Sequence, residues 1–167
     1  LLAELKNKKL DEKTVYKLNF KAFYKDIQVK HCGWNNQKIK RLYNKNITKY
    51  NSNDVHEDII TDSLKIEELK GNVEHYSYHT ISEFIIKADR YSTLFASNNA
   101  GKKSSSPVKA FFNASYSFFR TYILKQGFRD GYVGLVIAFS HMVTNFYKYI
   151  KLYEKNLELK NRYNDKK

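Results

Sequence analysis

The sequence has a single cysteine, a single proline and no long hydrophobic run. With Cys32 alone, the chain can form neither an intramolecular disulfide nor a zinc site of the CxxC type, which favours a reducing compartment such as the cytoplasm. The longest apolar run, residues 133–143, is shorter than the roughly 20 residues that a helix needs to cross a bilayer. We therefore expect a cytoplasmic protein that does not span a membrane.

Acidic residues are also few, so the chain carries a strong positive charge. The 17 Asp and Glu residues are outnumbered by 30 Lys and Arg residues, for a net charge of +13. This charge favours an anionic partner: nucleic acid, an acidic membrane surface or a phosphorylated substrate, among which charge alone does not choose. Hydrophobic residues still make up 42% of the 167 residues, so we expect one folded domain rather than a disordered chain.

Several catalytic and binding motifs are missing. The zinc-protease pattern H-E-x-x-H fails because the fourth residue after His56 is Ile60. The hydrolase pattern G-x-S-x-G is absent, and the GKK at 101–103 lacks the glycine spacing of a phosphate-binding loop. RNP-type, KH and zinc-finger patterns are absent too. Nucleic-acid binding is therefore supported only by the positive charge.

The first half of the chain has the patterns of short β-strands. Residues 15–29 alternate apolar and polar side chains, with a turn expected at Asp26, and this predicts a hairpin. Residues 38–43 predict another short strand, and residues 54–60 and 72–78 could each supply one more.

Helical spacing begins at Thr80. Thr80 and Glu83 form a T-x-x-E capping box, so we expect a helix over residues 80–97. After a loop at 98–106, Ser106 and Pro107 are a favourable N-cap and first-turn pair for a second helix.

The second helix is expected to end at Gly127 and a third to begin at Asp130, with a polar tail that frays after Tyr153. Both helices are amphipathic. Their apolar sides comprise Val108, Phe111, Phe112, Phe119, Tyr122 and Ile123 in the second helix, and Phe139, Val143, Phe146, Ile150 and Tyr153 in the third. Their polar sides carry Lys109, Asn113 and Arg120 in the second helix, and His141, Asn145, Lys148 and Lys151 in the third.

The tract from Arg90 to Tyr153 combines these aromatic sides with many cations, and its only acidic residue is Asp130. Amphipathic helices of this kind suit the headgroup layer of an anionic membrane, where each Lys or Arg adds about 1 kcal/mol. In the alternative interpretation, the aromatic sides form the core and the charges are its solvated face. We expect membrane contact.

The segment DVHED at 54–58 is the candidate catalytic cluster. It is either a solvated turn, in which Asp54 caps a neighbouring segment, or the position of a general base. A carboxylate can remove the proton of a sugar hydroxyl if burial or a neighbouring charge tunes its pKa, and His56 could orient the acceptor or bind a metal.

An ordered series of short motifs resembles the C-terminal half of bacterial family-two glycosyltransferases of the GT-A fold, of the type that builds the lipopolysaccharide or lipooligosaccharide core. The resemblance extends over about residues 15–153. It rests on GW at 33–34, KRLYNKN at 40–46, VHE at 55–57, HYSY at 75–78, Lys87 with Tyr91 and Ser92, GKK at 101–103 and GFRDGYVGL at 127–135. It implies a mixed α/β fold in which short strands are followed by three helices.

The resemblance also implies a chemistry for the cluster. Glu57 would deprotonate the acceptor hydroxyl as it attacks the sugar with inversion, while a divalent metal, Mg or Mn, stabilises the departing nucleotide diphosphate. His56 would contact the acceptor or the diphosphate and is a weak metal-ligand candidate. Asp54 or Asp58 would be the base if the register differs.

Further substrate-binding candidates follow from the same resemblance. Trp34 would stack on a sugar and Arg41 would meet a phosphate, although each has an equally plausible structural role. Lys102 and Lys103 of the GKK motif are the remaining substrate-binding candidates.

The nucleotide-binding half of such enzymes, with its DxD-like motif, has no counterpart in this chain. LLAELKNKKL has no Met and resembles the helix that follows that half, so we expect a fragment that is inactive alone. Residues 1–98 would form the acceptor side of the catalytic domain, 99–153 the membrane-associated helices and 154–167 the tail. The parent enzyme would use a nucleotide-sugar donor and a glycan or lipid-linked acceptor at the inner face of the bacterial cytoplasmic membrane. A non-enzymatic membrane-surface module and, less favoured, a nucleic-acid binder are the alternatives.

Overall fold

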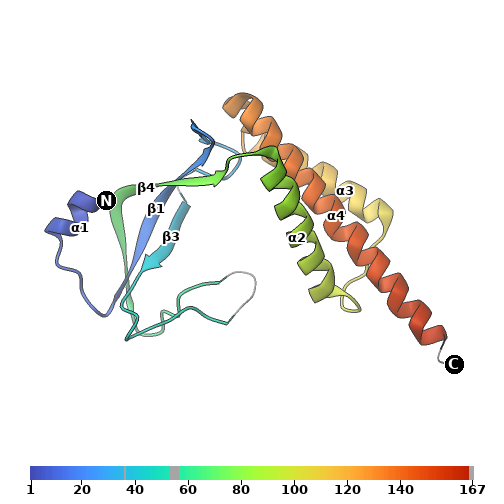
Figure 1. The fold of residues 1–167 in the computed structure, drawn as a ribbon, viewed down its shortest axis with the longest axis horizontal. Coiled ribbons are helices and arrows are strands. Elements are labelled where there is room, and N and C mark those ends of the chain that lie inside the picture. Colours follow the sequence, from blue (N-terminus) through green and yellow to red (C-terminus); the bar gives the residue numbers. More distant parts are fainter. Residues whose placement is uncertain (36, 53–56, 166–167) are drawn as a thin grey trace. The chain divides into compact units, whose positions relative to one another are not determined.

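The computed structural model describes residues 1–35, 37–52 and 57–165 and divides into two compact units. The sheet unit comprises residues 1–23 and 34–76, and the helical unit comprises residues 24–33 and 77–167. The protein is mixed α/β, with a small antiparallel sheet and several helices (Figure 1). This confirms the predicted fold class at that level.

The sheet is built around β1. Helix α1 (Leu2–Asn7) precedes β1 (Thr14–Tyr24), β2 (Ile27–Gln28), β3 (Gln37–Leu42) and β4 (Lys65–Tyr78). Strand β1 pairs with β2, with β4 and, in antiparallel register, with β3, where Leu18 lies opposite Ile39. The predicted hairpin is confirmed, and its turn begins at Lys25, whose φ is 51°. Strand β4 begins seven residues before the predicted strand at 72–78.

The core of the sheet unit contains apolar residues from the start and the end of β1. Val15, Tyr16 and Ala22 are buried together with Leu69 of β4 and Ile59. Ile59 forms an isolated antiparallel bridge with Tyr50. Of the strand predicted at 54–60, residues 54–56 lie outside the described residues. In the described part, 57–60, the only strand-like pairing is that bridge.

Helix α2 (Ile81–Asn99) begins as its capping box predicts. The hydroxyl oxygen of Thr80 accepts the backbone N–H of Glu83 at 3.3 Å, and the carboxylate of Glu83 accepts the N–H of His79 at 2.8 Å. These two bonds satisfy donors that the first turn of a helix leaves unpaired.

Helix α3 (Pro107–Phe119) also starts at its predicted cap, because the Ser106 hydroxyl oxygen accepts the N–H of Lys109 at 3.1 Å. A π-helical turn η1 (Arg120–Leu124) follows, then a 3-10 turn η2 (Gly127–Asp130) and helix α4 (Gly131–Asn164). The prediction that Gly127 ends the helix is wrong. Gln126 adopts the left-handed conformation, with φ at 55°, whereas Gly127 is buried.

The tail does not fray after Tyr153, because α4 continues to Asn164. Asn156 explains part of this order. Its Oδ1 accepts the N–H of Gly101 at 2.9 Å, and its Nδ2 donates to the carbonyl of Lys103 at 2.9 Å. The sequence prediction missed these bonds because they join α4 to a loop more than 50 residues away.

The helical unit packs α2 and α3 against α4 largely through small side chains (Figure 1). The buried positions on these helices include Ala88, Ser92, Ala96, Ala110, Ala114, Ile137, Ala138 and Leu152. Small side chains let helices approach closely. Lys151, which was placed on the solvated side, instead joins α4 to α2 through an ion pair with Asp89 at 2.6 Å. Among the described residues, no helix is both long and apolar enough to cross a bilayer.

Candidate functional site

Glu57 lies near the end of the loop 49–60, which belongs to the sheet unit. The two ends of the loop are joined by backbone hydrogen bonds from Asn51 to Asp58 at 2.9 Å and from Ile60 to Lys49 at 3.1 Å. Glu57 itself is exposed and lies outside the helices and strands. Asp54 and His56, the other predicted site residues of this loop, lie outside the described residues.

Two basic residues of β3 hold the base of this loop. The Lys40 ammonium forms an ion pair with Asp58 at 2.6 Å and donates to the carbonyl of Ile59 at 3.2 Å. Arg41 Nη1 donates to the Tyr50 hydroxyl at 3.0 Å. The motif KRLYNKN therefore contacts Tyr50 and the two residues, Asp58 and Ile59, that follow the VHE motif in the sequence.

The ion pair separates the roles of the two described carboxylates. The hydrogen bond from Lys40 lowers the pKa of Asp58, which makes Asp58 a weaker base and a structural anion. Glu57 is exposed, as is Asp58, and Asp54 lies outside the described residues. This arrangement favours Glu57 over Asp58 as a base.

The remaining predicted site residues are divided between the two units. Trp34 is partly buried and, like Arg41, belongs to the sheet unit. Lys102 and Lys103 lie in the exposed loop after α2, in the helical unit, where Lys102 donates to the carbonyl of Asn98 at 3.1 Å and Lys103 lies 5.7 Å from the ring centre of Phe95. These contacts give Arg41 and both lysines structural partners as well as exposure.

Two motifs of the series meet at the start of α2. The Tyr78 ring of HYSY stacks on Phe84 with 3.8 Å between ring centres. The Lys87 ammonium lies 3.9 Å from the centre of the Tyr78 ring and donates to the carbonyl of Ser77 at 3.0 Å. Lys87 therefore acts here as a packing residue.

The segment 30–32, which precedes the GW motif, contacts the region of GFRDGYVGL. The backbone N–H of Cys32 donates to the carbonyl of Lys125 at 3.1 Å, and its Sγ lies 3.8 Å from the carbonyl oxygen of Gly134. The carboxylate of Asp130 accepts the backbone N–H groups of Lys30 and His31. Gly134 and Asp130 therefore have structural reasons for their positions in this motif.

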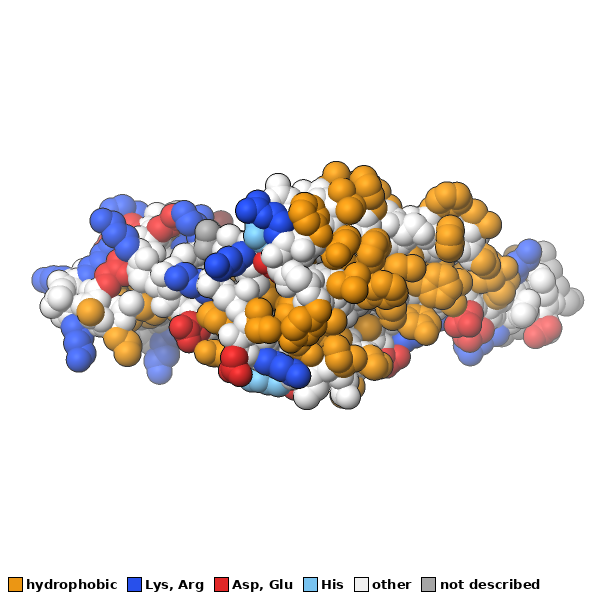
Figure 2. Space-filling model, turned by 90° about the horizontal axis from the view of Figure 1, so that it is seen from above, with side chains coloured by type: hydrophobic (Ala, Val, Ile, Leu, Met, Phe, Trp, Pro, Cys, Tyr) orange, Lys and Arg blue, Asp and Glu red, His pale blue; other side chains and the backbone are white. Residues whose placement is uncertain are grey.

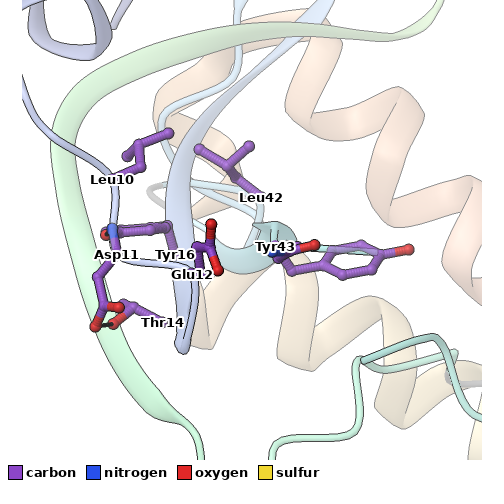
Figure 3. A pocket seen from close by; sticks show the side chains of 8 residues that line it. Leu10, Asp11, Glu12, Thr14, Tyr16, Leu42 and Tyr43 are labelled. Atoms are coloured by element: carbon purple, nitrogen blue, oxygen red, sulfur yellow. Dashed lines mark hydrogen bonds between the residues drawn. The ribbon is translucent and has the colours of Figure 1, made fainter. Parts of the chain in front are cut away.

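A small pocket of about 190 Å³ lies beside the start of β1 in the sheet unit (Figure 3). Two acidic residues, Asp11 and Glu12, line it, and Asp11 accepts the Thr14 hydroxyl at 2.8 Å and the N–H of Lys13 at 3.1 Å. These bonds lower the pKa of Asp11 and fix the turn that leads into β1. We assign this carboxylate a structural role.

Metal binding finds no support in the described ranges, where no group of three His, Cys, Asp or Glu side chains is placed to hold an ion. His56, the weak candidate, lies outside those ranges.

The aromatic sides of α3 and α4 face outward. Phe111 and Phe112 are 58% and 66% exposed, and Figure 2 shows hydrophobic side chains gathered over the helices. The exposed set on α3, η1, η2 and α4 includes Val108, Tyr116, Phe119, Ile123, Leu124, Phe128, Tyr132 and Phe139. The sequence predicted these apolar sides correctly, but the small residues beside them form the helix contacts.

The polar sides of the same two helices line a pocket of about 450 Å³. Helical spacing predicted solvated positions for Asn113, Arg120, His141, Asn145 and Lys148. It did not predict that they line one pocket. Their helical spacing was visible, but the pairing of α3 with α4 was not.

Comparison with known proteins gave no match to a protein-family model and no match to a solved structure. The resemblance to glycosyltransferases therefore stays a prediction from motifs.

Proposed function

We propose that this chain is the acceptor-side, membrane-associated part of an inverting, nucleotide-sugar-dependent glycosyltransferase of the GT-A fold that works on an anionic membrane surface. The observation that carries the membrane part is the exposure of the aromatic sides of α3 and α4. The enzymatic part is supported by the motif series, of which HYSY and Lys87 pack together in the fold. The donor and its divalent metal would be bound by a preceding nucleotide-binding region.

The exposed aromatic side fits a lipid surface by both polarity and charge. Soluble proteins rarely expose large contiguous apolar patches unless these are interaction sites. Burying one such side chain in the headgroup and acyl boundary contributes about 1.5–3 kcal/mol. Exposed cations on the same elements, among them Lys109, Arg120 and Arg129, complement anionic headgroups.

Vesicle sedimentation tests the membrane contact. The chain is mixed with vesicles of phosphatidylglycerol and phosphatidylcholine, and with vesicles of phosphatidylcholine alone. We expect preferential binding to the anionic vesicles and at least about a tenfold loss for the double variant Phe111→Ser, Phe112→Ser. The control Ile47→Ser, Ile66→Ser removes two exposed apolar side chains from the sheet unit and should bind normally. Equal binding by both double variants would contradict the assigned face.

Sugar transfer by the full-length product of the gene tests the catalytic part. With a panel of nucleotide sugars and a lipid-linked acceptor, Glu57→Gln should lower kcat by about 10²-fold or more, because the general base is lost. Asp62→Asn, an exposed carboxylate a few residues away, is the matched control. Unchanged turnover in Glu57→Gln would remove Glu57 from the mechanism.

These two assays, together with an RNA-binding assay, separate the alternatives. Vesicle binding without transfer by the full-length protein would indicate a membrane-surface module. Tight RNA binding without preference for anionic vesicles would indicate a nucleic-acid-binding protein. An Asp-x-Asp pattern after a strand in the coding sequence upstream of Leu1 would support the enzyme.

A further inference from the structure

The pocket between α3 and α4 is formed by two polar stripes that face each other. Helix α3 and η1 contribute Asn113, Ser117, Arg120 and Thr121, whose spacing of four, three and one places them on one side of a helix. Helix α4 contributes His141, Thr144, Asn145 and Lys148 with the same kind of spacing. The hollow between them, about 450 Å³, is large enough for a phosphate group with part of the molecule that carries it.

The π-helical turn places two cations on the same side of this pocket. In an α-helix, residues five apart point about 140° away from each other. Here the N–H of Lys125 donates to the carbonyl of Arg120 at 2.9 Å, an i to i+5 bond that brings the two residues about one turn apart. Both line the pocket. Single π-turns of this kind recur at functional sites.

The lining carries cations without a matching carboxylate. Arg120, Lys125 and Lys148 line the pocket, and the described lining residues include no Asp or Glu. Burial lowers the pKa of Lys148. Burial, and then the charges of Lys125 and Lys148, lower the pKa of His141 to about 4. Burial is the larger cause for His141, and the neighbouring cations add to it; a bound anion would relieve the effect of these cations.

The uncharged lining residues form a fixed framework around these cations. Asn145 Nδ2 donates to the Ser117 hydroxyl oxygen at 2.9 Å, so the hydroxyl hydrogen of Ser117 can be donated elsewhere. The Thr121 hydroxyl lies 3.1 Å from Nδ1 of His141 and is itself buried. Hydroxyl, amide and guanidinium donors of this kind recognise phosphate oxygens.

We propose that the α3–α4 pocket binds a phosphate group, as the dianion of a phosphate monoester. Two negative charges match a site with three cations better than a single carboxylate does, and the Arg120 guanidinium offers a planar pair of donors. The monoester can belong to a soluble sugar phosphate or to a phosphorylated lipid headgroup. This assignment does not depend on the proposed function. If both hold, the pocket would bind a phosphate of the acceptor.

Heteronuclear NMR of the whole chain tests the site. Inorganic phosphate and glucose 6-phosphate are titrated in turn at constant ionic strength and about pH 7.5, where the dianion predominates, and the titrations are repeated over a series of lower pH values. We expect saturable shifts in the His141 ring and in the amides of Thr121 and Asn145, and a rise of the His141 pKa when phosphate is bound. The double variant Lys125→Gln, Lys148→Gln should bind at least about tenfold more weakly.

The matched control is Lys155→Gln, Lys160→Gln, which removes the same charge from the distal part of α4 and should bind within about twofold of wild type. Circular dichroism checks that each variant is folded. If the double variant is not folded, Arg120→Gln, which changes an exposed residue, serves as a second site variant. Unsaturable shifts spread over many lysines, equal losses in site and control variants, or an unchanged His141 pKa would each overturn the proposal.

Phosphatidate in nanodiscs supplies the lipid-borne monoester. Weaker binding by the site variant to phosphatidate, with unchanged response to glucose 6-phosphate, would contradict one shared site, whereas parallel losses support it. Phe111→Ser, Phe112→Ser should keep glucose 6-phosphate binding while losing vesicle binding. Failure of the membrane proposal is therefore distinguishable from failure of the phosphate site.

Discussion

His31 lies against Asp130, with 2.8 Å between imidazole Nδ1 and carboxylate Oδ1, although 99 residues separate them. The same carboxylate accepts the backbone N–H of His31 at 2.7 Å and that of Lys30 at 3.2 Å, and its side chain is only 4% exposed. Asp130 precedes α4, as the sequence predicted, but its side chain binds the 30–31 segment instead of capping the helix. This one carboxylate fixes that segment to the turn before α4.

Replacing Asp130 should therefore destabilise the helical unit. Asp130→Ala leaves two backbone N–H groups without their acceptor, and we expect a loss of about 3 kcal/mol in the free energy of unfolding. Urea denaturation followed by circular dichroism measures it. The control Glu154→Ala changes an exposed carboxylate of α4 and should stay within about 0.5 kcal/mol of wild type. A loss below about 1 kcal/mol for Asp130→Ala would show that these bonds contribute little.

Gly134 is required by a close backbone approach. A Cβ at this position would lie 1.8 Å from the carbonyl oxygen of Gly127, so α4 and η2 would have to separate. We expect Gly134→Ala to cost at least about 3 kcal/mol or to prevent folding, because backbone atoms cannot move aside as a flexible side chain can. Thermal unfolding measures the change, with Leu135→Ala, at a neighbouring exposed position, as the control. Equal melting temperatures for the two variants would contradict the close packing.

The predictable parts of the fold are those set by local chemistry. The hairpin around Asp26 and the starts of α2 and α3 follow from side-chain alternation and from capping residues such as Thr80 and Ser106, whose partners are three residues away. The end of α3 was missed because the π-turn depends on the packing of Gly127 against Cys32 and Thr121, which no local pattern reveals.

The candidate sites show the same limit. Periodicity identified the aromatic and polar sides of α3 and α4, yet it could not say that Ala110 and Ala114 would make the helix contact or that Arg120 and Lys148 would line one pocket. Which surfaces meet depends on contacts between residues far apart in the sequence. The motif series indicated related positions, and the fold gives one of its pairs, HYSY and Lys87, a packing explanation.

Cys32 should be protected from thiol reagents while the protein is folded. It is fully buried, and burial, followed by the charge of Asp130, raises the pKa of its thiol to about 12, so the reactive thiolate is scarce. At about pH 8 we expect iodoacetamide to alkylate it at least about 10²-fold more slowly in buffer than in urea. Mass spectrometry follows the reaction, and Ser104→Cys supplies an exposed thiol as control. Equal rates for the two thiols in the folded protein would contradict the burial.

His141 should make the helical unit less stable in mild acid. Its pKa falls from 6.5 to about 4 on folding, because burial and the facing cations Lys125, on the turn after α3, and Lys148, on α4, oppose the charged imidazolium. Above about pH 6.5 the ring is neutral in both states and has no effect on stability. As the pH falls toward 4, the unfolded chain takes up a proton that the folded chain refuses, so stability declines by up to about 3 kcal/mol. Urea denaturation at about pH 7.5 and pH 5 should show a smaller decline for His141→Gln than for wild type, whereas His79→Gln, an exposed control, should follow wild type. Identical declines for wild type and His141→Gln would exclude His141 as the responsible group. Added phosphate should reduce the decline in wild type, since a bound dianion stabilises the imidazolium.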